Sequence, residues 1–128
     1  FDLTAIASPV IPVLHPSPDD GSDAVRATID RILATRSDIP AVLLDAWSAT
    51  TIGGSGQLGN WDLAAQLTRD YPIILAGGLS PDNVARAIAE VHPIGVDVAS
   101  GVETDKVKDA DKINSFVAEA RSAFASTS

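Results

Sequence analysis

The sequence contains no cysteine and no methionine among its 128 residues. Without cysteine the chain cannot form a disulfide bond, a thiolate metal site or a cysteine nucleophile. Aromatic residues make up only 5% of the chain, and no apolar run approaches the roughly 18 residues of a membrane span. The first residues also lack the basic and then apolar pattern of a signal peptide. We therefore expect a soluble, cytoplasmic protein.

Positive charge is scarce. Nine Lys and Arg residues face seventeen Asp and Glu residues, which gives a formal net charge of −8. Nucleic-acid grooves and anionic membrane surfaces need clustered positive charge, so we expect neither nucleic acid nor membrane as a partner. The length fits one domain. Because the chain begins with Phe1 and not with Met, we expect it to be a fragment.

Four short apolar runs, rich in β-branched residues and bounded by Pro, Gly or Asp, predict strands. They lie at residues 10–14, 41–44, 72–76 and 94–98. None shows strict polar alternation, which is typical of parallel strands that are buried on both faces. Pro12 has no amide hydrogen for a strand ladder, so the first run is expected at a sheet edge or in an irregular strand.

A helical pattern follows each of these runs. Ser22 or Asp23 is expected to cap the first helix, and Asn60 the second. Ser80 is expected to cap the third helix, with Pro81 in its first helical position. The last helix is expected to begin near Asp109. Its apolar face would hold Ile113, Phe116, Val117, Ala120 and Phe124.

The order is thus strand and then helix, four times over. Repeated βα units form either a small open α/β sheet or part of a (βα)₈ barrel. A complete barrel needs around 250 residues. The chain therefore has the size of about half a barrel.

Ligands of parallel α/β folds bind at the carboxyl ends of the strands. Asp45 ends the second strand and is a candidate general acid or base, although it could instead cap the following loop. Gly77 and Gly78 follow the third strand, and Ser100 and Gly101 follow the fourth. Glycines at such ends let a ligand approach main-chain N–H groups, which favours a phosphate cradle, or they serve tight turns alone.

Three further features are candidate parts of a ligand site. Asp97 lies within the fourth apolar run, where a buried carboxylate needs hydrogen-bond donors, a ligand or a polar contact inside a barrel. The glycine run at residues 53–56, which includes Gly54, is typical of a ligand-binding loop or lid. Trp61 could offer a flat surface to an aromatic substrate.

The two histidines carry no metal-site pattern. Neither His15 nor His92 has a partner at the spacing of metal ligands, and each lies beside a proline at the end of an element. We therefore expect both to be ordinary loop histidines and predict no metal site.

Taken in order and with their spacing, several segments resemble the phosphoribosylanthranilate isomerases of tryptophan biosynthesis. The segments are Leu43-Leu44-Asp45, residues 53–56 with Trp61, residues 74–84, residues 95–103, Lys108-Asp109 and Lys112-Ile113. The resemblance covers nearly the whole chain. It implies a (βα)₈ TIM-barrel fold in which residues 1–128 are the last four βα units, with the N-terminal half of the barrel missing.

The resemblance also implies an activity. The family converts N-(5′-phosphoribosyl)anthranilate to 1-(2-carboxyphenylamino)-1-deoxyribulose 5-phosphate by an Amadori rearrangement, without cofactor or metal. Asp45 matches the general acid of the family, Gly78, Ser100 and Gly101 match its phosphate site, and Asp97 would lie near the anthranilate end. The family's general base, a cysteine at the end of the first strand, has no counterpart.

A chain with the acid but without the base is expected to be inactive or nearly so when it is isolated. Its partners would be the phosphoribosyl substrate and the missing half of the barrel, and its exposed strand edges would favour self-association. One departure from the family pattern is Lys106, which stands where the family often has glycine.

Two other functions stay open. The chain could be a half barrel that binds a sugar phosphate without chemistry, or an inactive fragment. Another phosphate-binding barrel, such as indole-glycerol-phosphate synthase or a pentose-phosphate epimerase, would need a catalytic Lys and Glu pair or metal ligands. The predicted strand ends show neither.

Overall fold

A computed structural model describes residues 3–47 and 60–127. The chain is an α/β protein with a four-stranded parallel sheet in the order β1-β2-β3-β4. The strands are β1 (Val13–Leu14), β2 (Val42–Asp45), β3 (Ile73–Ala76) and β4 (Gly95–Val96). All four predicted strands are present, although the first and the last are three residues shorter than their apolar runs and the third is one residue shorter. The first strand lies at an edge of the sheet, as Pro12 predicts.

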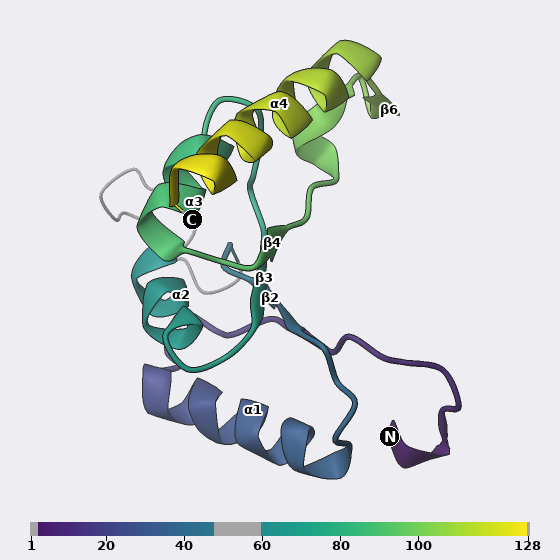
Figure 1. Cartoon of the computed structure of the whole chain (residues 1–128), viewed down its shortest axis with the longest axis vertical. Coiled ribbons are helices and arrows are strands. Elements are labelled where there is room, and N and C mark those ends of the chain that lie inside the picture. The colour runs from purple at the N-terminus through teal and green to yellow at the C-terminus, as the bar shows by residue number, and fades with distance from the viewer. Residues whose placement is uncertain (1–2, 48–59, 128) are drawn as a thin grey trace.

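A helix follows each strand. The helices are α1 (Ser22–Thr35), α2 (Trp61–Thr68), α3 (Val84–Val91) and α4 (Ala110–Thr127). They form an arc beside the sheet, from α1 through α2 and α3 to α4 (Figure 1). Consecutive parallel strands joined by helices are the arrangement of a (βα)₈ barrel segment, so the predicted fold class is confirmed.

Four short elements complete the described chain. They are the 3₁₀ helices η1 (Leu3–Ala5) and η2 (Ser100–Val102) and the hairpin strands β5 (Glu103–Thr104) and β6 (Val107–Lys108). The hairpin, which the sequence did not predict, pairs its strands antiparallel. Its turn places Asp105 and Lys106 at φ 52° and 67°. Such left-handed values at both central residues are typical of the tight turns that join two-residue hairpins.

Burial alternates along the central strands. Val42 and Leu44 of β2 are fully buried against the helices, whereas Leu43 and Asp45 are only partly buried. The prediction that the strands are buried on both faces is therefore wrong for the described residues: one face packs on helices and the other is open. Each βα unit supplies a helix to one face only.

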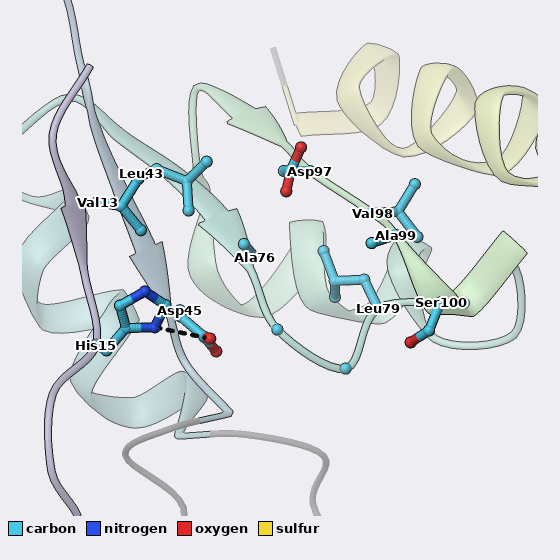
Figure 2. Close-up of a pocket in the computed structure, with 13 residues that line it drawn as sticks. Val13, His15, Leu43, Asp45, Ala76, Leu79, Asp97, Val98, Ala99 and Ser100 are labelled. Atoms are coloured by element: carbon cyan, nitrogen blue, oxygen red, sulfur yellow. Dashed lines mark hydrogen bonds and ion pairs between the residues drawn. The ribbon is translucent and has the colours of Figure 1, made fainter. Parts of the chain in front are cut away.

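The open face is layered. Strand pairing puts Val13, Leu43, Ile74 and Gly95 in register across the sheet. Side chains two residues further along a strand point to the same face, so the next layer holds His15, Asp45, Ala76 and Asp97. The lower layer is apolar, whereas three of the four residues of the upper layer, His15, Asp45 and Asp97, are polar. Figure 2 shows labelled side chains of both layers around one pocket.

The covered face forms the hydrophobic core. Its largest fully buried side chains come from the helices and the central strands: Ile29, Leu44, Trp61, Leu67, Ile73, Leu75 and Ile88. Trp61 is only 1% exposed, and the guanidinium of Arg86 lies 4.8 Å from the centre of its ring. The prediction that Trp61 offers its ring to a substrate is therefore wrong, because the ring packs in the core at the start of α2.

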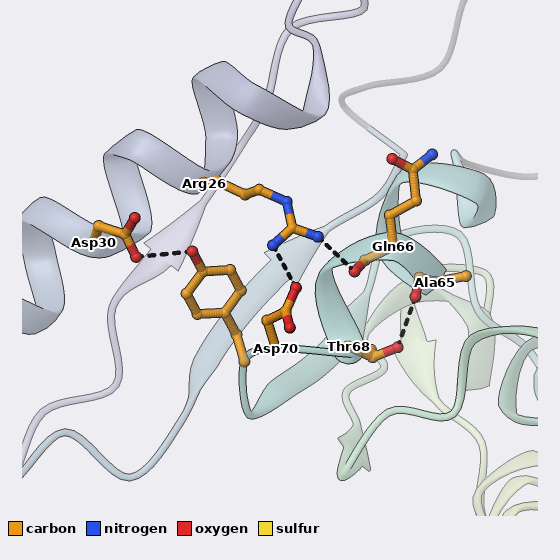
Figure 3. A network of polar contacts seen from close by, with 7 residues as sticks. Arg26, Asp30, Ala65, Gln66, Thr68 and Asp70 are labelled. Carbon is orange, nitrogen blue, oxygen red and sulfur yellow. Dashed lines mark hydrogen bonds and ion pairs between the residues drawn. The ribbon is translucent and has the colours of Figure 1, made fainter.

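A polar network joins α1 to the end of α2 (Figure 3). Arg26 pairs with the carboxylate of Asp70 and donates a hydrogen bond of 3.0 Å to the carbonyl oxygen of Gln66. The hydroxyl of Tyr71 donates to Asp30 at 2.7 Å. This bond to a carboxylate raises the pKa of Tyr71. The network fixes α1 against α2 at the periphery of the core.

The helix starts agree with the sequence in two cases out of four. Asn60 caps α2 by accepting a hydrogen bond of 3.0 Å from the Leu63 amide. Asp109 precedes α4, and its Oδ1 accepts a bond of 2.9 Å from the Asp111 amide. The cap of α1 is Gly21, which has no side chain, and not Ser22 or Asp23.

The third helix begins at Val84, three residues after the predicted first position. Residues 81–83 form a turn. The side chain of Asn83 accepts a bond of 2.9 Å from the Ser80 amide and donates one of 2.9 Å to the Gly78 carbonyl. Asparagine side chains that bond to nearby backbone compete with helical hydrogen bonds. This explains why the helix does not start at Pro81.

The outermost helix is only partly covered. Phe116 and Ala120 of α4 are buried, but Ile113 and Val117 are 39% and 40% exposed. The prediction of one packed apolar face is thus only partly correct. Among the described elements, α4 packs mainly against α3 and also contacts η2. None of the described helices has the length and apolar character that a membrane crossing requires.

Candidate active site

A pocket of about 350 Å³ lies at the carboxyl end of the parallel sheet (Figure 2). Residues from the first three strands and from the segments after β1, β3 and β4 line it: Val13, His15, Leu43, Asp45, Ala76, Gly77, Gly78, Leu79, Asp97, Val98, Ala99, Ser100 and Gly101. Six of the predicted site residues therefore meet in one place. Their roles stay predictions, and Gly54, the seventh, lies outside the described residues.

Asp45 is held at the end of β2 by contacts on both carboxylate oxygens. Its Oδ1 accepts a hydrogen bond of 3.0 Å from the amide of Trp47. Its Oδ2 lies 3.1 Å from Nδ1 of His15. The side chain is 26% exposed. The carboxylate thus bonds to the loop that it begins, as the alternative interpretation of the sequence predicted, and also faces the pocket.

The turn after β3 packs directly on Asp45. Gly77 and Gly78 adopt φ values of 95° and 71°, in the left-handed region that favours glycine. A Cβ atom at position 77 would lie 2.2 Å from Oδ1 of Asp45, and one at position 78 would lie 2.8 Å from Cε3 of Trp47. Both glycines therefore have a structural reason, and both leave backbone facing the pocket.

The turn after β4 contacts the turn after β3. Gly101 lies in η2, where a Cβ atom would be 1.8 Å from the carbonyl oxygen of Leu79. Within the described part of the chain, the amides of Gly77, Gly78, Ser100 and Gly101 donate no hydrogen bond. Backbone N–H groups of this kind are ready donors for an anion.

Asp97 differs from its prediction. It follows the end of β4 and is exposed, so it is not a carboxylate buried within a strand. Its amide continues the sheet by donating a bond of 2.9 Å to the Leu75 carbonyl. The difference has a simple cause, since β4 has only two residues and its open face is uncovered within the described residues.

His15 is a site residue that the sequence interpretation missed. It lies two residues beyond Val13, on the same face of the sheet, and reaches Asp45 from a strand 30 residues earlier in the chain. Aligning the carboxyl ends of the first two predicted strands would have placed His15 opposite Asp45. Trp47 was also missed; it is 50% exposed and lies beside Gly78.

The described lining of the pocket contains two carboxylates and no lysine or arginine. The ammonium group of Lys108 lies near the η2 turn, where its Nζ donates to the Ala99 carbonyl at 3.0 Å and to Oε2 of Glu103 at 2.6 Å. An anionic ligand would thus rely mainly on backbone amides. No group of three or more His, Cys, Asp or Glu side chains among the described residues could hold a metal ion.

Comparison with known proteins agrees with this geometry. The family model of N-(5'phosphoribosyl)anthranilate (PRA) isomerase matches residues 19–119. The chain is 52% identical over 87 residues to the N-(5'-phosphoribosyl)anthranilate isomerase of Acetivibrio thermocellus, covering 67% of this chain and 40% of that protein. It is 45% identical over 124 residues to that of Haloferax volcanii, covering 94% of this chain and 52% of that protein. The chain thus spans about half the length of the curated relatives that it matches.

Solved structures show the same relationship. The chain matches phosphoribosyl anthranilate isomerase from Thermococcus kodakaraensis with a TM-score of 0.67 and 36% identity, over 88% of this chain and 52% of that one. It also matches a phosphoribosyl anthranilate isomerase in complex with reduced 1-(o-carboxyphenylamino)-1-deoxyribulose 5-phosphate, with a TM-score of 0.52 and 35% identity, over 76% of this chain and 44% of that one. The resemblance inferred from the sequence is confirmed, and the chain belongs to the N-(5'-phosphoribosyl)anthranilate isomerase family.

Proposed function

We propose that this chain supplies the general acid and the phosphate-binding side of an isomerase active site. The reaction is the Amadori rearrangement of N-(5′-phosphoribosyl)anthranilate to 1-(2-carboxyphenylamino)-1-deoxyribulose 5-phosphate, in tryptophan biosynthesis. The observation that carries the proposal is the pocket itself: Asp45 and the two glycine-containing turns line one hollow at the carboxyl end of the sheet.

Asp45 is proposed to act in the ring-opening step. Its protonated carboxyl group gives a proton to the ribose ring oxygen, and the bond between that oxygen and the anomeric carbon breaks to leave a Schiff base. The contacts from Trp47 and His15 hold the carboxyl group at the mouth of the pocket. A positioned acid of this kind typically accelerates a reaction by roughly 10² to 10⁴.

The phosphate group of the substrate is proposed to bind at the other end of the pocket. The free amides of Gly78, Ser100 and Gly101 are its donors. Backbone donors suit a chain of net charge −8, because they bind an anion without a local lysine or arginine. Asp97 lines the same pocket, and we place it beside the anthranilate end of the substrate.

The second proton transfer needs a base outside this chain. After the ring opens, a proton must leave the neighbouring sugar carbon, and the family's base is a cysteine in the N-terminal half of the barrel. This chain has no cysteine. We therefore propose that the isolated chain is inactive and that a complete barrel is active. "Complete barrel" here means this chain preceded by an N-terminal half barrel, either its own or that of the Haloferax volcanii relative.

The test is to compare turnover by the isolated chain with turnover by the complete barrel. Consumption of N-(5′-phosphoribosyl)anthranilate is followed with both proteins at equal concentration. We expect the complete barrel to turn over the substrate and the isolated chain not to do so. Activity of the isolated chain would contradict the assignment of the base, and a folded complete barrel without activity would contradict the isomerase function.

The open sides of the sheet support the need for a partner half. β1 and β4 are edge strands, and Ile11, Val13 and Ile94 beside them are 47%, 52% and 60% exposed. Unpaired strand edges with apolar side chains favour pairing with other chains. We propose that the N-terminal half of the barrel covers these edges, and that the isolated chain self-associates. If the isolated chain is a monodisperse monomer in light scattering at high concentration, the proposed self-association is contradicted.

A non-catalytic sugar-phosphate-binding half barrel is the alternative. It is supported by one observation: the described residues with free backbone amides, Gly78, Ser100 and Gly101, line the pocket within this chain. Calorimetric titration of the isolated chain with the reduced product analogue separates the two functions. If the isolated chain binds the analogue tightly and the complete barrel does not turn over the substrate, the non-catalytic binding function is favoured.

A further inference from the structure

His15 connects the proposed acid with solvent. Its Nδ1 lies 3.1 Å from Oδ2 of Asp45. The histidine side chain is 63% exposed, whereas that of Asp45 is 26% exposed. The exposed ring therefore contacts the less exposed carboxyl group directly. No such contact was predicted from the sequence.

The imidazole ring stands between two hollows. On one side it lines the site pocket of about 350 Å³. On the other side it lines a second hollow of about 230 Å³, together with Leu14, Pro16, Asp20, Ala24, Val25 and Thr28. Among the described residues, the other charged groups that line these two hollows are thus Asp45 and Asp97 in the site pocket and Asp20 in the second hollow. Asp20 is engaged by the Ser17 amide at 2.9 Å.

The proposed reaction creates a need for this arrangement. An acid that gives its proton to the ring oxygen ends the step as a carboxylate, and it must be protonated again before the next substrate opens. A substrate in the pocket covers the carboxyl group from the sugar side. Histidine is the side chain whose ordinary charge change falls near neutral pH, so it can both accept and release a proton under working conditions.

We propose that His15 is a proton relay that reprotonates Asp45 from solvent in each catalytic cycle. The inference rests on the proposed function of Asp45. Asp45 first gives its proton to the sugar ring oxygen. The imidazolium of His15 then gives its Nδ1 proton to Oδ2 of Asp45 and becomes a neutral imidazole. The imidazole takes a proton from water or a buffer acid, which restores the imidazolium. One proton thus passes from solvent to the acid for each turnover.

The test uses the complete barrel with two substitutions of the histidine. His15→Asn keeps an N–H donor near Asp45 but cannot carry a proton, and His15→Leu removes both properties. We expect kcat to fall about tenfold in both variants, less than the roughly 10² to 10⁴ of a direct acid or base, because water can reprotonate Asp45 slowly. KM should change little, since the relay acts through Asp45. Imidazole added to the assay should restore kcat in both variants.

The matched control is His92→Asn. His92 is also exposed but lies at the C-terminal end of α3 with φ 56°, a conformation that asparagine tolerates. Its kcat should equal that of the parent and should not respond to imidazole. Melting curves of all variants should agree with the parent, because both histidines are exposed.

Each other outcome overturns the relay. If His15→Asn keeps the parent kcat while His15→Leu loses it, His15 only positions Asp45 by a hydrogen bond. If both lose activity and imidazole restores neither, no proton passes through this site. If both keep the parent kcat, Asp45 is reprotonated by another route. If the parent barrel itself is inactive, the proposed function fails, and the relay fails with it.

Discussion

The two faces of the sheet make opposite demands on the same strands. On β2, Leu44 points to the helices and is fully buried, while the next residue, Asp45, points to the open face and lines the pocket. Apolar side chains on the covered face remove surface from water and hold the helices. Side chains on the open face leave a hollow in which chemistry can occur. The comparison teaches that a residue of the core and a residue of the proposed site are separated here by a single step along a strand.

The largest expected effect comes from a substitution on the open face, which should lower turnover and leave stability unchanged. Asp45→Asn keeps the size of the side chain but removes the acid, so turnover by the complete barrel should fall by roughly 10² to 10⁴. The melting temperature should stay close to that of the parent, because both side chains accept a hydrogen bond from the Trp47 amide. Steady-state kinetics and differential scanning fluorimetry measure the two quantities. A variant with the parent kcat would remove Asp45 from the mechanism.

The adjacent substitution breaks the covered face. Leu44→Ala leaves a cavity in the core between β2 and the helices, and we expect a loss of about 2–5 kcal/mol in the free energy of unfolding. The residual kcat of the folded fraction should stay near the parent value, since Leu44 does not line the pocket. Urea unfolding of the complete barrel measures the stability. A loss of kcat as large as that of Asp45→Asn, at unchanged stability, would contradict the separation of the two faces.

A smaller effect on stability is expected in the β5–β6 hairpin, which belongs to neither face of the parallel sheet. Lys106 adopts φ 67° in the hairpin turn, where its side chain makes the backbone unfavourable. Lys106→Gly, which introduces the residue that the family often has there, should raise the free energy of unfolding by about 0.5–1 kcal/mol. Lys106→Ala is the control, because it removes the same charge but keeps Cβ. An equal gain from alanine would attribute the effect to charge.

The smallest expected effect depends on pH. The pKa of Asp109 is lowered, first by the hydrogen bond of 2.7 Å from the Thr104 hydroxyl and then by backbone amides at the start of α4. Because the pKa is lower in the folded chain than in the unfolded one, the carboxylate stabilises the fold above the ordinary Asp range. This contribution is lost as the pH falls through the folded pKa.

Asp109→Asn should therefore lower the melting temperature at neutral pH, and the difference from the parent should shrink in acid. Asp111→Asn, in the first turn of the same helix, is the matched control for charge. Melting curves at several pH values measure both. A difference from the parent that stays constant with pH would show that the Asp109 charge does not contribute.

Much of this arrangement could be predicted from the sequence, because it depends on local patterns and on one topological rule. Short apolar runs fixed the four strands, and parallel pairing places all their carboxyl ends at one edge. Asp45 and Gly101, which are far apart in the chain, thus had to lie near each other. The pairing of Asn60 with the start of α2 follows equally from local capping chemistry.

The remainder depends on contacts that no local pattern contains. His15 reaches Asp45 only through the register of two strands, and its neighbours in sequence give no sign of this. Trp61 follows a glycine-rich segment, but the face of α2 on which it lies turns its ring into the core. The late start of α3 arises from the side chain of Asn83, whose bonds to Ser80 and Gly78 compete with helix formation.

The unequal exposure of the two tryptophans gives the protein two built-in optical reporters. Trp61, at 1% exposure, should emit at short wavelength and follow unfolding of the core, whereas Trp47, at 50% exposure, should emit at longer wavelength. Trp47 lies against Gly78 at the rim of the pocket. Because Gly78 lines the pocket, we expect emission from a Trp61→Phe protein, in which Trp47 is the one remaining tryptophan, to change when a ligand binds there.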